Sequence, residues 1–327
     1  MKFSTVLSSS LMVVAALAAP TPTVQEPVNA AFEKRASVTD TPVGYASQNG
    51  GTTGGAGGTT TTVSSFAEFT AAVSSSDKKV VYVSGPITQA AKQVKVGSNT
   101  SIIGKDSSVV FTGFGLIVKG MSNVVIRNIA IAKVLAANGD AIGVQKSTNV
   151  WIDHVDVSSD RDHDKDFYDG LLDLTHAADF VTISNSFVHD HWKASLVGHS
   201  DSNGAEDKGH LRVTYANNLF ENLNSRGPSF RFGTGHMFNN YYNSVSDGIN
   251  TRQGAQVLVE NNVFVDSKKS VYSTDGGFAV ATGNDFGSGS NTAPAGTLKT
   301  VPYSYTKLDA SAVKAAVVGT AGVTLKF

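Results

Sequence analysis

Asn149-Val-Trp-Ile-Asp-His154 is one copy of a short motif that recurs along this chain of 327 residues. Each copy alternates apolar and polar positions, as a short β-strand does, and ends in a polar residue that is usually Asn. The other clear copies are Asn123-Val-Val-Ile-Arg-Asn128, Phe180-Val-Thr-Ile-Ser-Asn185, Arg212-Val-Thr-Tyr-Ala-Asn217 and Gln256-Val-Leu-Val-Glu-Asn261. Two weaker copies end at Asn240 and Gly283.

The spacing of these copies predicts the architecture. From residue 128 to residue 283, successive closing residues are 26, 31, 32, 23, 21 and 22 positions apart. Periods of this length indicate a solenoid, because one unit cannot bury its apolar face alone and must stack on its neighbours. Short strands with Asn at the corners favour an all-β fold, the right-handed parallel β-helix, in which corner Asn side chains can form a hydrogen-bonded ladder. Leucine-rich repeats have a similar period, but their columns of Leu are missing from this sequence.

One helix is predicted ahead of the repeats. Ser65 stands three residues before Glu68, which is the spacing of a capping box. Phe66, Phe69 and Val73 fall on one helical face. We therefore expect an N-terminal capping helix that covers the first coil and its exposed strand edge.

The first 35 residues carry a targeting pattern. Lys2 precedes an apolar run at 11–17 that is followed by small residues, which predicts a secretory signal peptide over 1–18 and an extracellular protein. The next segment, 19–35, ends in the basic pair Lys34-Arg35 and is predicted to be a propeptide, although an exposed linker pair would look the same. Residues 36–327 are then predicted to form a single parallel β-helix catalytic domain.

Composition excludes several classes of protein. The chain has 26 Lys and Arg against 27 Asp and Glu, a net charge of -1, which argues against a nucleic acid or a membrane as partner. It has no cysteine, so a secreted form must be held by its core and backbone hydrogen bonds. Asn99-Thr100-Ser101 is an N-glycosylation sequon, and Asn99 is the predicted glycan site.

The two longest repeats lie in the middle of the chain and predict where the functional site is. Their extra length is predicted to form loops on one face of the solenoid, at Ser158 to Asp166 and at His189 to Lys208, and such a face is often the binding face. All eight histidines also lie in one part of the chain, between His154 and His236.

Three carboxylates stand out beside these loops. Asp169 and Asp173 are four residues apart, and in a strand this spacing points both side chains to one side. Asp140 holds a comparable place one coil earlier. Carboxylate oxygens from two adjacent coils would suit Ca²⁺ better than a softer metal. Solvated surface aspartates are the simpler interpretation of the same pattern.

Basic residues occupy comparable places on later coils. Arg226 and Arg231 lie five residues apart around a proline, and Lys193 lies between them and the aspartates in sequence. Stacked coils would bring these cations into line with the carboxylates. The line would be either a self-neutralising structural cluster or a groove for an anionic polymer.

Four segments together resemble the pectate lyases of polysaccharide lyase family one. They are Trp151-Ile-Asp-His154, Asp169-Gly-Leu-Leu-Asp173, Gly198-His-Ser-Asp201 and Arg226-Gly-Pro-Ser-Phe-Arg231, and the resemblance extends from about Asn123 to Asn262. That family is a right-handed parallel β-helix that cleaves α-1,4-linked polygalacturonate by Ca²⁺-dependent β-elimination. The resemblance implies the following roles: Asp140, Asp169 and Asp173 as calcium ligands, Arg226 as the catalytic base, and Lys193 and Arg231 as contacts to substrate carboxylates.

The resemblance implies a secreted, monomeric, endo-acting enzyme that degrades plant cell-wall pectin and gives 4,5-unsaturated oligogalacturonides. Asp153 and His154 are interpreted as structural. Some relatives have an acidic residue where this chain has Asn138, which implies that fewer metal ions bind before the substrate.

Three other functions fit a solenoid. A pectin lyase acts on methyl-esterified substrate without Ca²⁺, but its aromatic cleft agrees poorly with two Trp residues and three retained aspartates. A polygalacturonase would need aspartate clusters in other motifs. A non-catalytic polysaccharide-binding solenoid is not distinguished by fold alone.

Overall fold

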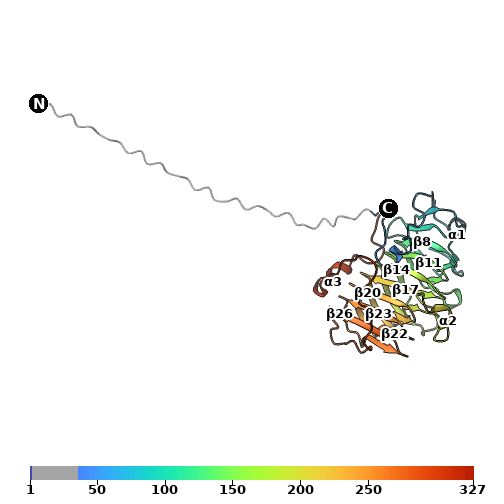
Figure 1. Ribbon diagram of the computed structural model, residues 1–327. Helices are drawn as coiled ribbons and strands as arrows, with labels where there is room; N and C mark the ends of the chain where they lie inside the picture. Colours follow the sequence, from blue (N-terminus) through green and yellow to red (C-terminus); the bar gives the residue numbers. More distant parts are fainter. Residues whose placement is uncertain (2–35) are drawn as a thin grey trace. The chain divides into compact units, whose positions relative to one another are not determined.

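The computed structural model describes Met1 and residues 36–327. The predicted signal peptide and propeptide therefore lie outside the described residues, apart from Met1. Residues 36–327 form the right-handed parallel β-helix that the repeats predict, and each full coil adds one strand to each of three parallel sheets. In Figure 1 the strands labelled β8 to β26 follow one another in the order of their colours.

We call the three sheets I, II and III in the order in which a coil passes through them. Sheet I consists of β1 (Thr59–Val63), β2 (Lys79–Val83), β5 (Thr100–Gly104), β8 (Ser122–Arg127), β11 (Thr148–Asp153), β14 (Asp179–Ser184), β17 (Arg212–Ala216), β20 (Thr234–Phe238), β23 (Gln256–Glu260) and β26 (Phe278–Thr282). Sheet II consists of β3 (Ile87–Thr88), β6 (Val110–Thr112), β9 (Ala130–Ala132), β12 (Asp156–Ser158), β15 (Phe187–Lys193), β18 (Leu219–Ser225), β21 (Tyr241–Val245) and β24 (Val263–Val265). Sheet III consists of β4 (Val94–Lys95), β7 (Leu116–Lys119), β10 (Ile142–Gln145), β13 (Leu172–Thr175), β16 (Ser195–Val197), β19 (Ser229–Arg231), β22 (Asp247–Arg252) and β25 (Lys269–Thr274).

The core is a set of apolar columns that run through the coils. Val150 and Ile152 of β11 are fully buried, and each pairs in register with a β-branched residue on β8 and on β14. Because neighbouring parallel strands are about 4.8 Å apart, each side chain packs on its equivalent one coil away. Repetition of the same apolar positions therefore builds one continuous core.

From β8 onward, most of the sheet I strands are followed by a corner residue in the left-handed conformation. Asn is favoured there because its short polar side chain tolerates positive φ. The corner residues are Asn128, His154, Asn185, Asn217, Asn239 and Asn261, with φ between 48° and 59°. The predicted corner at Asn240 is wrong by one residue: Phe238 pairs with Ala216, so Asn239 is the equivalent of Asn217. The repeats from Asn217 to Asn261 are therefore two equal steps of 22.

Asn240 belongs to a separate, buried ladder. The side-chain amides of Asn218, Asn240 and Asn262 each donate to the side-chain oxygen of the next Asn, at 2.9, 2.9 and 3.0 Å, and the ladder ends at Asn284. The predicted asparagine ladder thus exists, but one position after the corner residues. Each rung links two coils inside the solenoid, where an unpaired amide would be costly.

The predicted capping helix is confirmed as α1 (Phe66–Val73). Ser65 Oγ accepts from the amide of Glu68, and the Glu68 carboxylate accepts from the amide of Ser65, which completes the capping box. Phe69 and Val73 are fully buried against the first coils.

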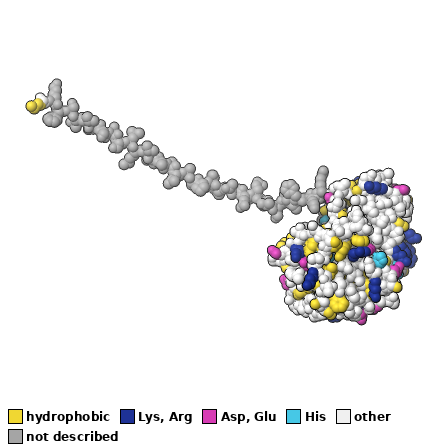
Figure 2. Space-filling model, in the orientation of Figure 1, with side chains coloured by type: hydrophobic (Ala, Val, Ile, Leu, Met, Phe, Trp, Pro, Cys, Tyr) yellow, Lys and Arg dark blue, Asp and Glu magenta, His cyan; other side chains and the backbone are white. Residues whose placement is uncertain are grey.

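Two further α-helices and two 3-10 helices were not predicted. α3 (Ala310–Val317) buries Val313 and Val317 against the outer face of sheet II. The others are α2 (Gly204–Asp207), η1 (Tyr45–Ser47) and η2 (Ala136–Asn138). Within the described residues, every helix is too short or too polar to cross a membrane. Figure 2 shows basic and acidic side chains interspersed over the face in view, in keeping with the near-neutral charge.

Candidate active site

The three predicted calcium ligands come from two consecutive coils at the start of sheet III. Asp140 follows η2 and precedes β10, and Asp169 and Asp173 belong to the next coil. Asp173 lies on β13 between the buried residues Leu172 and Leu174, so its side chain faces outward. Asp169 was predicted to share that strand, but β13 begins only at Leu172 and Asp169 lies in the preceding loop.

Gly170 lets two of these carboxylates converge. A Cβ atom at Gly170 would lie 2.5 Å from Asp173 Oδ1 and 3.1 Å from Asp140 Oδ1, so a larger residue would displace both groups. The backbone amide of Gly170 also donates to Asp140 Oδ1 at 3.2 Å, and the amide of Leu196 donates to Asp173 Oδ1 at 3.2 Å. Backbone groups therefore hold two carboxylates around one point.

The carboxylates repel one another in this arrangement. Burial, followed by the charges of Asp173 and Asp169, raises the pKa of Asp140 to about 9. Burial also raises the pKa of Asp173 to about 6, although the charge of Arg226 acts in the opposite direction. Repulsion of this kind is costly unless a cation is added, and hard oxygen ligands of this type favour Ca²⁺.

The third carboxylate, Asp169, lies beside a lysine. Lys193 Nζ lies 3.8 Å from Asp169 Oδ1 and 3.2 Å from Asp166 Oδ1. Across Met1 and residues 36–327, no three His, Asp or Glu side chains surround one point closely enough to form a ready-made metal site. The residue types fit Ca²⁺, but their present geometry is not a closed cage.

The predicted basic residues lie on the following coils. Lys193 ends β15 and pairs in register with Ser225, the residue before Arg226. Arg226 has a φ of 65°, and its carbonyl accepts from the amide of Ser195 at 2.8 Å. Arg231 ends β19 in sheet III, one coil beyond β16.

One of the two long insertions lies where it was predicted, and the other is displaced along the chain. The segment from His189 to Lys193, predicted to be a loop, is part of strand β15, and His191 points into the core with only 1% of its surface exposed. The first insertion is at 159–171, before β13, and contains the predicted segment except Ser158, whereas the second is at 198–211, after β16. Sheet III therefore has one long loop at each end of its central strands.

Sequence reasoning assigned no role to three charged residues near the predicted contacts. Asp166 pairs with Lys193 at 3.2 Å. Asp201 pairs with Arg231 at 2.5 Å and with Arg252 at 2.9 Å. Asp201 belongs to the Gly198-His-Ser-Asp201 segment that carried the resemblance, and Asp166 ends the acidic loop. The sequence therefore drew attention to both aspartates but did not predict which basic residue each one contacts.

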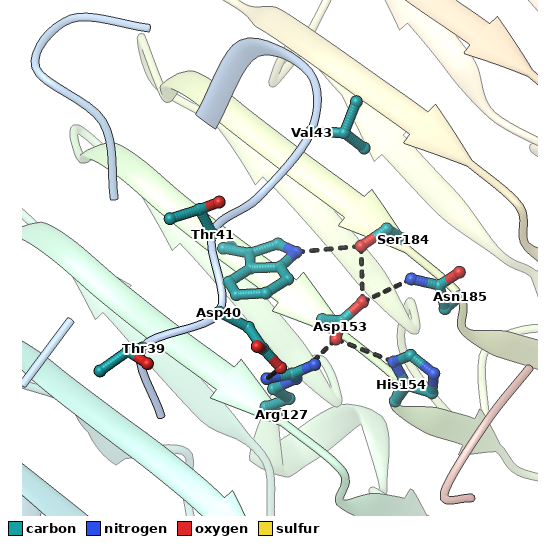
Figure 3. Close-up of a pocket in the computed structure, with 10 residues that line it drawn as sticks. Thr39, Asp40, Thr41, Val43, Arg127, Asp153, His154, Ser184 and Asn185 are labelled. Carbon is teal, nitrogen blue, oxygen red and sulfur yellow. Dashed lines mark hydrogen bonds and ion pairs between the residues drawn. The ribbon is translucent and has the colours of Figure 1, made fainter. Parts of the chain in front are cut away.

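A second polar cluster lies on sheet I, beside a cavity of about 450 Å³ (Figure 3). Asp153 is completely buried there and accepts hydrogen bonds from four side chains: Arg127 at 2.7 Å, His154 at 2.8 Å, Ser184 at 2.7 Å and Asn185 at 2.8 Å. Arg127 also pairs with Asp40 at 2.9 Å, which fastens the N-terminal segment to sheet I. This geometry agrees with the structural interpretation of Asp153 and His154.

The predicted glycan site, Asn99, is a partly exposed residue immediately before β5. Its Nδ2 donates to the carbonyl of Ser76 at 3.3 Å, and its Oδ1 accepts from Asn123 at 3.0 Å. Glycan attachment remains a prediction.

Comparison with known proteins gives a consistent result. The family model described as pectate lyase matches residues 18–326. A probable pectate lyase A of Aspergillus fumigatus is 70% identical over 327 residues, which are 100% of both chains. Pectate lyase A of Emericella nidulans is 70% identical over 312 residues, 95% of both chains. Among solved structures, a pectate lyase of Bacillus sp. N165 in complex with trigalacturonate has a TM-score of 0.81 at 34% identity, covering 87% of this chain and 99% of that chain.

Proposed function

This chain belongs to the pectate lyase family, and on that premise we propose that it cleaves α-1,4-linked polygalacturonate by Ca²⁺-dependent β-elimination. The products would be 4,5-unsaturated oligogalacturonides from the demethylated pectin of plant cell walls. The Bacillus sp. N165 relative is described in complex with trigalacturonate, which supports an acidic galacturonate chain as the substrate class.

The observation that carries the proposal is the placement of Asp140 and Asp173 around Gly170, next to a line of cations. Their raised pKa values mean that the negative charges of the two carboxylates are not fully compensated by nearby positive charge. Arg226 and Lys193 lie near enough to lower the pKa of Asp173, so the two halves of the site act on each other. A cation and an anionic substrate together would complete the charge balance of this site.

The protein's own residues supply positioning and proton transfer. Lys193 and Arg231 would pair with carboxylates of the polygalacturonate chain and fix its register along sheet III. Arg226 would then accept the proton from C5 as the bond from C4 to the leaving oxygen breaks and the C4–C5 double bond forms. A free guanidinium has a reference pKa of about 12.5–13.8, so an arginine base implies a rate that increases with pH.

Asp140, Asp169 and Asp173 would hold the metal. Bound Ca²⁺ would offset the charge of the substrate carboxylate next to C5 and so stabilise the anion that develops there. Asp169 pairs with Lys193 in the present structure. We therefore expect Asp169 to join the other two ligands when a substrate carboxylate takes over Lys193, which agrees with weak metal binding before the substrate.

The first test follows the unsaturated product directly. Purified protein is incubated with polygalacturonate, with Ca²⁺ or with excess EDTA, while near-ultraviolet absorbance is recorded. We expect product only with Ca²⁺. Full activity in EDTA would overturn the metal assignment, and a higher kcat/KM on fully methyl-esterified pectin would identify a pectin lyase instead.

The finer features need separate measurements. Endo-action predicts a rapid loss of substrate viscosity before much product absorbance appears. Secretion with removal of 1–35 predicts that the N-terminus of the extracellular protein is Ala36. An endoglycosidase should reduce the mass of the secreted protein if Asn99 carries a glycan, and a monomer should elute at the mass of one chain.

A further inference from the structure

Asp201 lies between two arginines of sheet III. Arg231 Nε donates to Asp201 Oδ1 at 2.5 Å, and Arg252 Nη2 donates to Asp201 Oδ2 at 2.9 Å. Arg231 and Arg252 are register partners on consecutive coils. One carboxylate therefore joins two guanidinium groups that are one strand spacing, about 4.8 Å, apart along the solenoid axis.

The backbone before Asp201 approaches Arg231 unusually closely. Gly198 has a φ of 87°, and a Cβ atom there would lie 2.7 Å from Arg231 Cβ. The Gly198 carbonyl also accepts from Arg231 Nη1 at 3.3 Å. The loop thus contacts Arg231 through both its backbone and its carboxylate, and only glycine permits this approach.

The two arginines depend on Asp201 to different degrees. Arg252 has a second carboxylate partner, Asp275 Oδ2, at 2.7 Å. Among the described residues, Arg231 forms an ion pair with Asp201 alone. The Arg231 side chain is 11% exposed, so few alternative positions are solvated. Removing Asp201 would therefore free Arg231 more than Arg252.

Arg252 shows that carboxylates determine these side-chain orientations. Its Nε is buried and has no hydrogen-bond partner among the described residues, while its Nη2 donates to both Asp201 and Asp275. A buried donor without a partner costs free energy, so the orientation is chosen by the two carboxylates rather than by full hydrogen bonding of the guanidinium.

We propose that Asp201 is a positioning residue for the lyase reaction, which holds Arg231 in the orientation that receives a substrate carboxylate and links it to Arg252 on the next coil. This role rests on the proposed function of Arg231. Asp201 binds the Nε edge of Arg231, and among the described residues Nη2 is left without a protein partner. Nη2 is the donor that would face the substrate.

Asp201→Asn tests the proposal with little change of shape. We expect KM for polygalacturonate to increase about 5- to 20-fold, because a charge-assisted hydrogen bond on a substrate-contacting group is lost. The kcat should stay within about twofold, since Asp201 contacts no reacting atom. Asp201→Glu retains the carboxylate and should restore most of the affinity.

Two controls separate positioning from a general structural role. Asp275→Asn removes a carboxylate from Arg252 but leaves the pair between Asp201 and Arg231, and should change KM less than Asp201→Asn does. In an Arg231→Ala background, adding Asp201→Asn should change KM by less than about twofold, because the side chain that it positions is gone.

The outcomes that contradict the proposal are distinct. An active wild type with an unchanged KM in Asp201→Asn, or with the full KM effect retained in the Arg231→Ala background, would overturn the positioning role alone. A fall in kcat at constant KM would also overturn it. Failure of the wild type to cleave polygalacturonate would overturn the proposed function and this role together.

Discussion

Asp153 on sheet I is completely buried and Asp140 beside sheet III is partly buried, and their pKa values move in opposite directions. Burial alone would raise the pKa of Asp153, but the hydrogen bond from His154 and the charge of Arg127 bring it below its ordinary value. Burial raises the pKa of Asp140 to about 9, and the neighbouring Asp173 and Asp169 add to this effect. The charges of the sheet I cluster balance one another, whereas the carboxylates of the sheet III cluster repel one another.

This contrast separates a structural cluster from a candidate functional cluster by physical criteria. In the sheet I cluster, each partner of Asp153 is a donor, so ionisation of Asp153 stabilises the fold. In the sheet III cluster, ionisation of Asp140 opposes folding until positive charge arrives. A cavity beside the first cluster says little about chemistry, because its buried charges already satisfy one another.

Arg226→Lys should give the largest effect and would locate the chemistry on sheet III. Lysine keeps the positive charge but not the planar group, so we expect kcat to fall about 10²–10⁴-fold, as for loss of a general base. KM should change little because Lys193 and Arg231 still contact substrate. Rates are measured by product absorbance between pH 7 and pH 10, and a wild-type kcat that declines steadily over this range would contradict an arginine base.

Asp153→Asn should affect stability rather than catalysis. The substitution removes the buried one of the two carboxylate partners of Arg127 and leaves only the more exposed Asp40, which costs about 3–5 kcal/mol in the free energy of unfolding. Because the pKa of Asp153 is lowered on folding, its contribution is present above the ordinary carboxyl pKa and is lost as the pH falls below it. Denaturant titrations at pH 7 and pH 3 should therefore show a smaller difference between variant and wild type at pH 3.

The activity of Asp153→Asn completes this test. Below its unfolding transition, the variant should retain kcat within about twofold of the wild type. A loss of kcat comparable to that of Arg226→Lys, in protein that is still folded by circular dichroism, would show that the sheet I cluster takes part in the reaction.

The repeats predict the solenoid because every coil has apolar residues at the same positions of its strands, and these positions recur in the sequence. They misplace the corner at Asn240 because two adjacent asparagines, Asn239 and Asn240, fit the same pattern, and only the pairing of Phe238 with Ala216 distinguishes them. α3 was missed because its eight residues lie after the last repeat and show only Val313 and Val317 as an apolar face.

The candidate site is predictable in its residue types but not in its pairings. Asp201 is 30 residues from Arg231 and 51 residues from Arg252 along the chain, so their contact is created by the stacking of coils. No short sequence motif predicts a contact between residues so far apart in the chain. The pairing of Lys193 with Asp166 and Asp169 also depends on the path of the loop at 159–171, which the spacing of repeats does not determine.

Asp140→Asn should stabilise the metal-free protein while it weakens calcium-dependent cleavage. A carboxyl with a raised pKa contributes stability that is fully present below the ordinary carboxyl pKa and is lost as the pH rises toward about 9. In EDTA, the variant should therefore gain about 0.5–2 kcal/mol in the free energy of unfolding at pH 8. Thermal unfolding at pH 5 and pH 8 checks the sign, since the gain should be smaller at pH 5.

Adding Ca²⁺ should reverse the order of stability in that experiment. The wild type should gain stability with Ca²⁺ and the Asp140→Asn variant should gain less, because it has lost one charged ligand. A variant that is less stable than the wild type in EDTA would mean that Asp140 is an ordinary structural carboxylate, like Asp153.

Asp166→Asn should give the smallest effect, because it alters an exposed partner of Lys193 rather than a residue to which the proposed function assigns a role. The Asp166 side chain is 70% exposed, and an ion pair at such a position contributes only about 0.2–1 kcal/mol. Asp166 forms an ion pair with the Lys193 ammonium group, to which a substrate carboxylate would bind. Removing the Asp166 charge should therefore lower KM for polygalacturonate by about 1.5- to 5-fold at unchanged kcat. The difference from wild type should shrink at high salt, which screens both pairs.

Asp164→Asn, two residues earlier in the same loop, changes the loop charge equally without removing a Lys193 contact, and should leave KM near the wild-type value. An equal fall in KM for both variants would assign the effect to the overall charge of the loop, whereas an increase for Asp166→Asn alone would mean that Asp166 orients Lys193 as Asp201 orients Arg231.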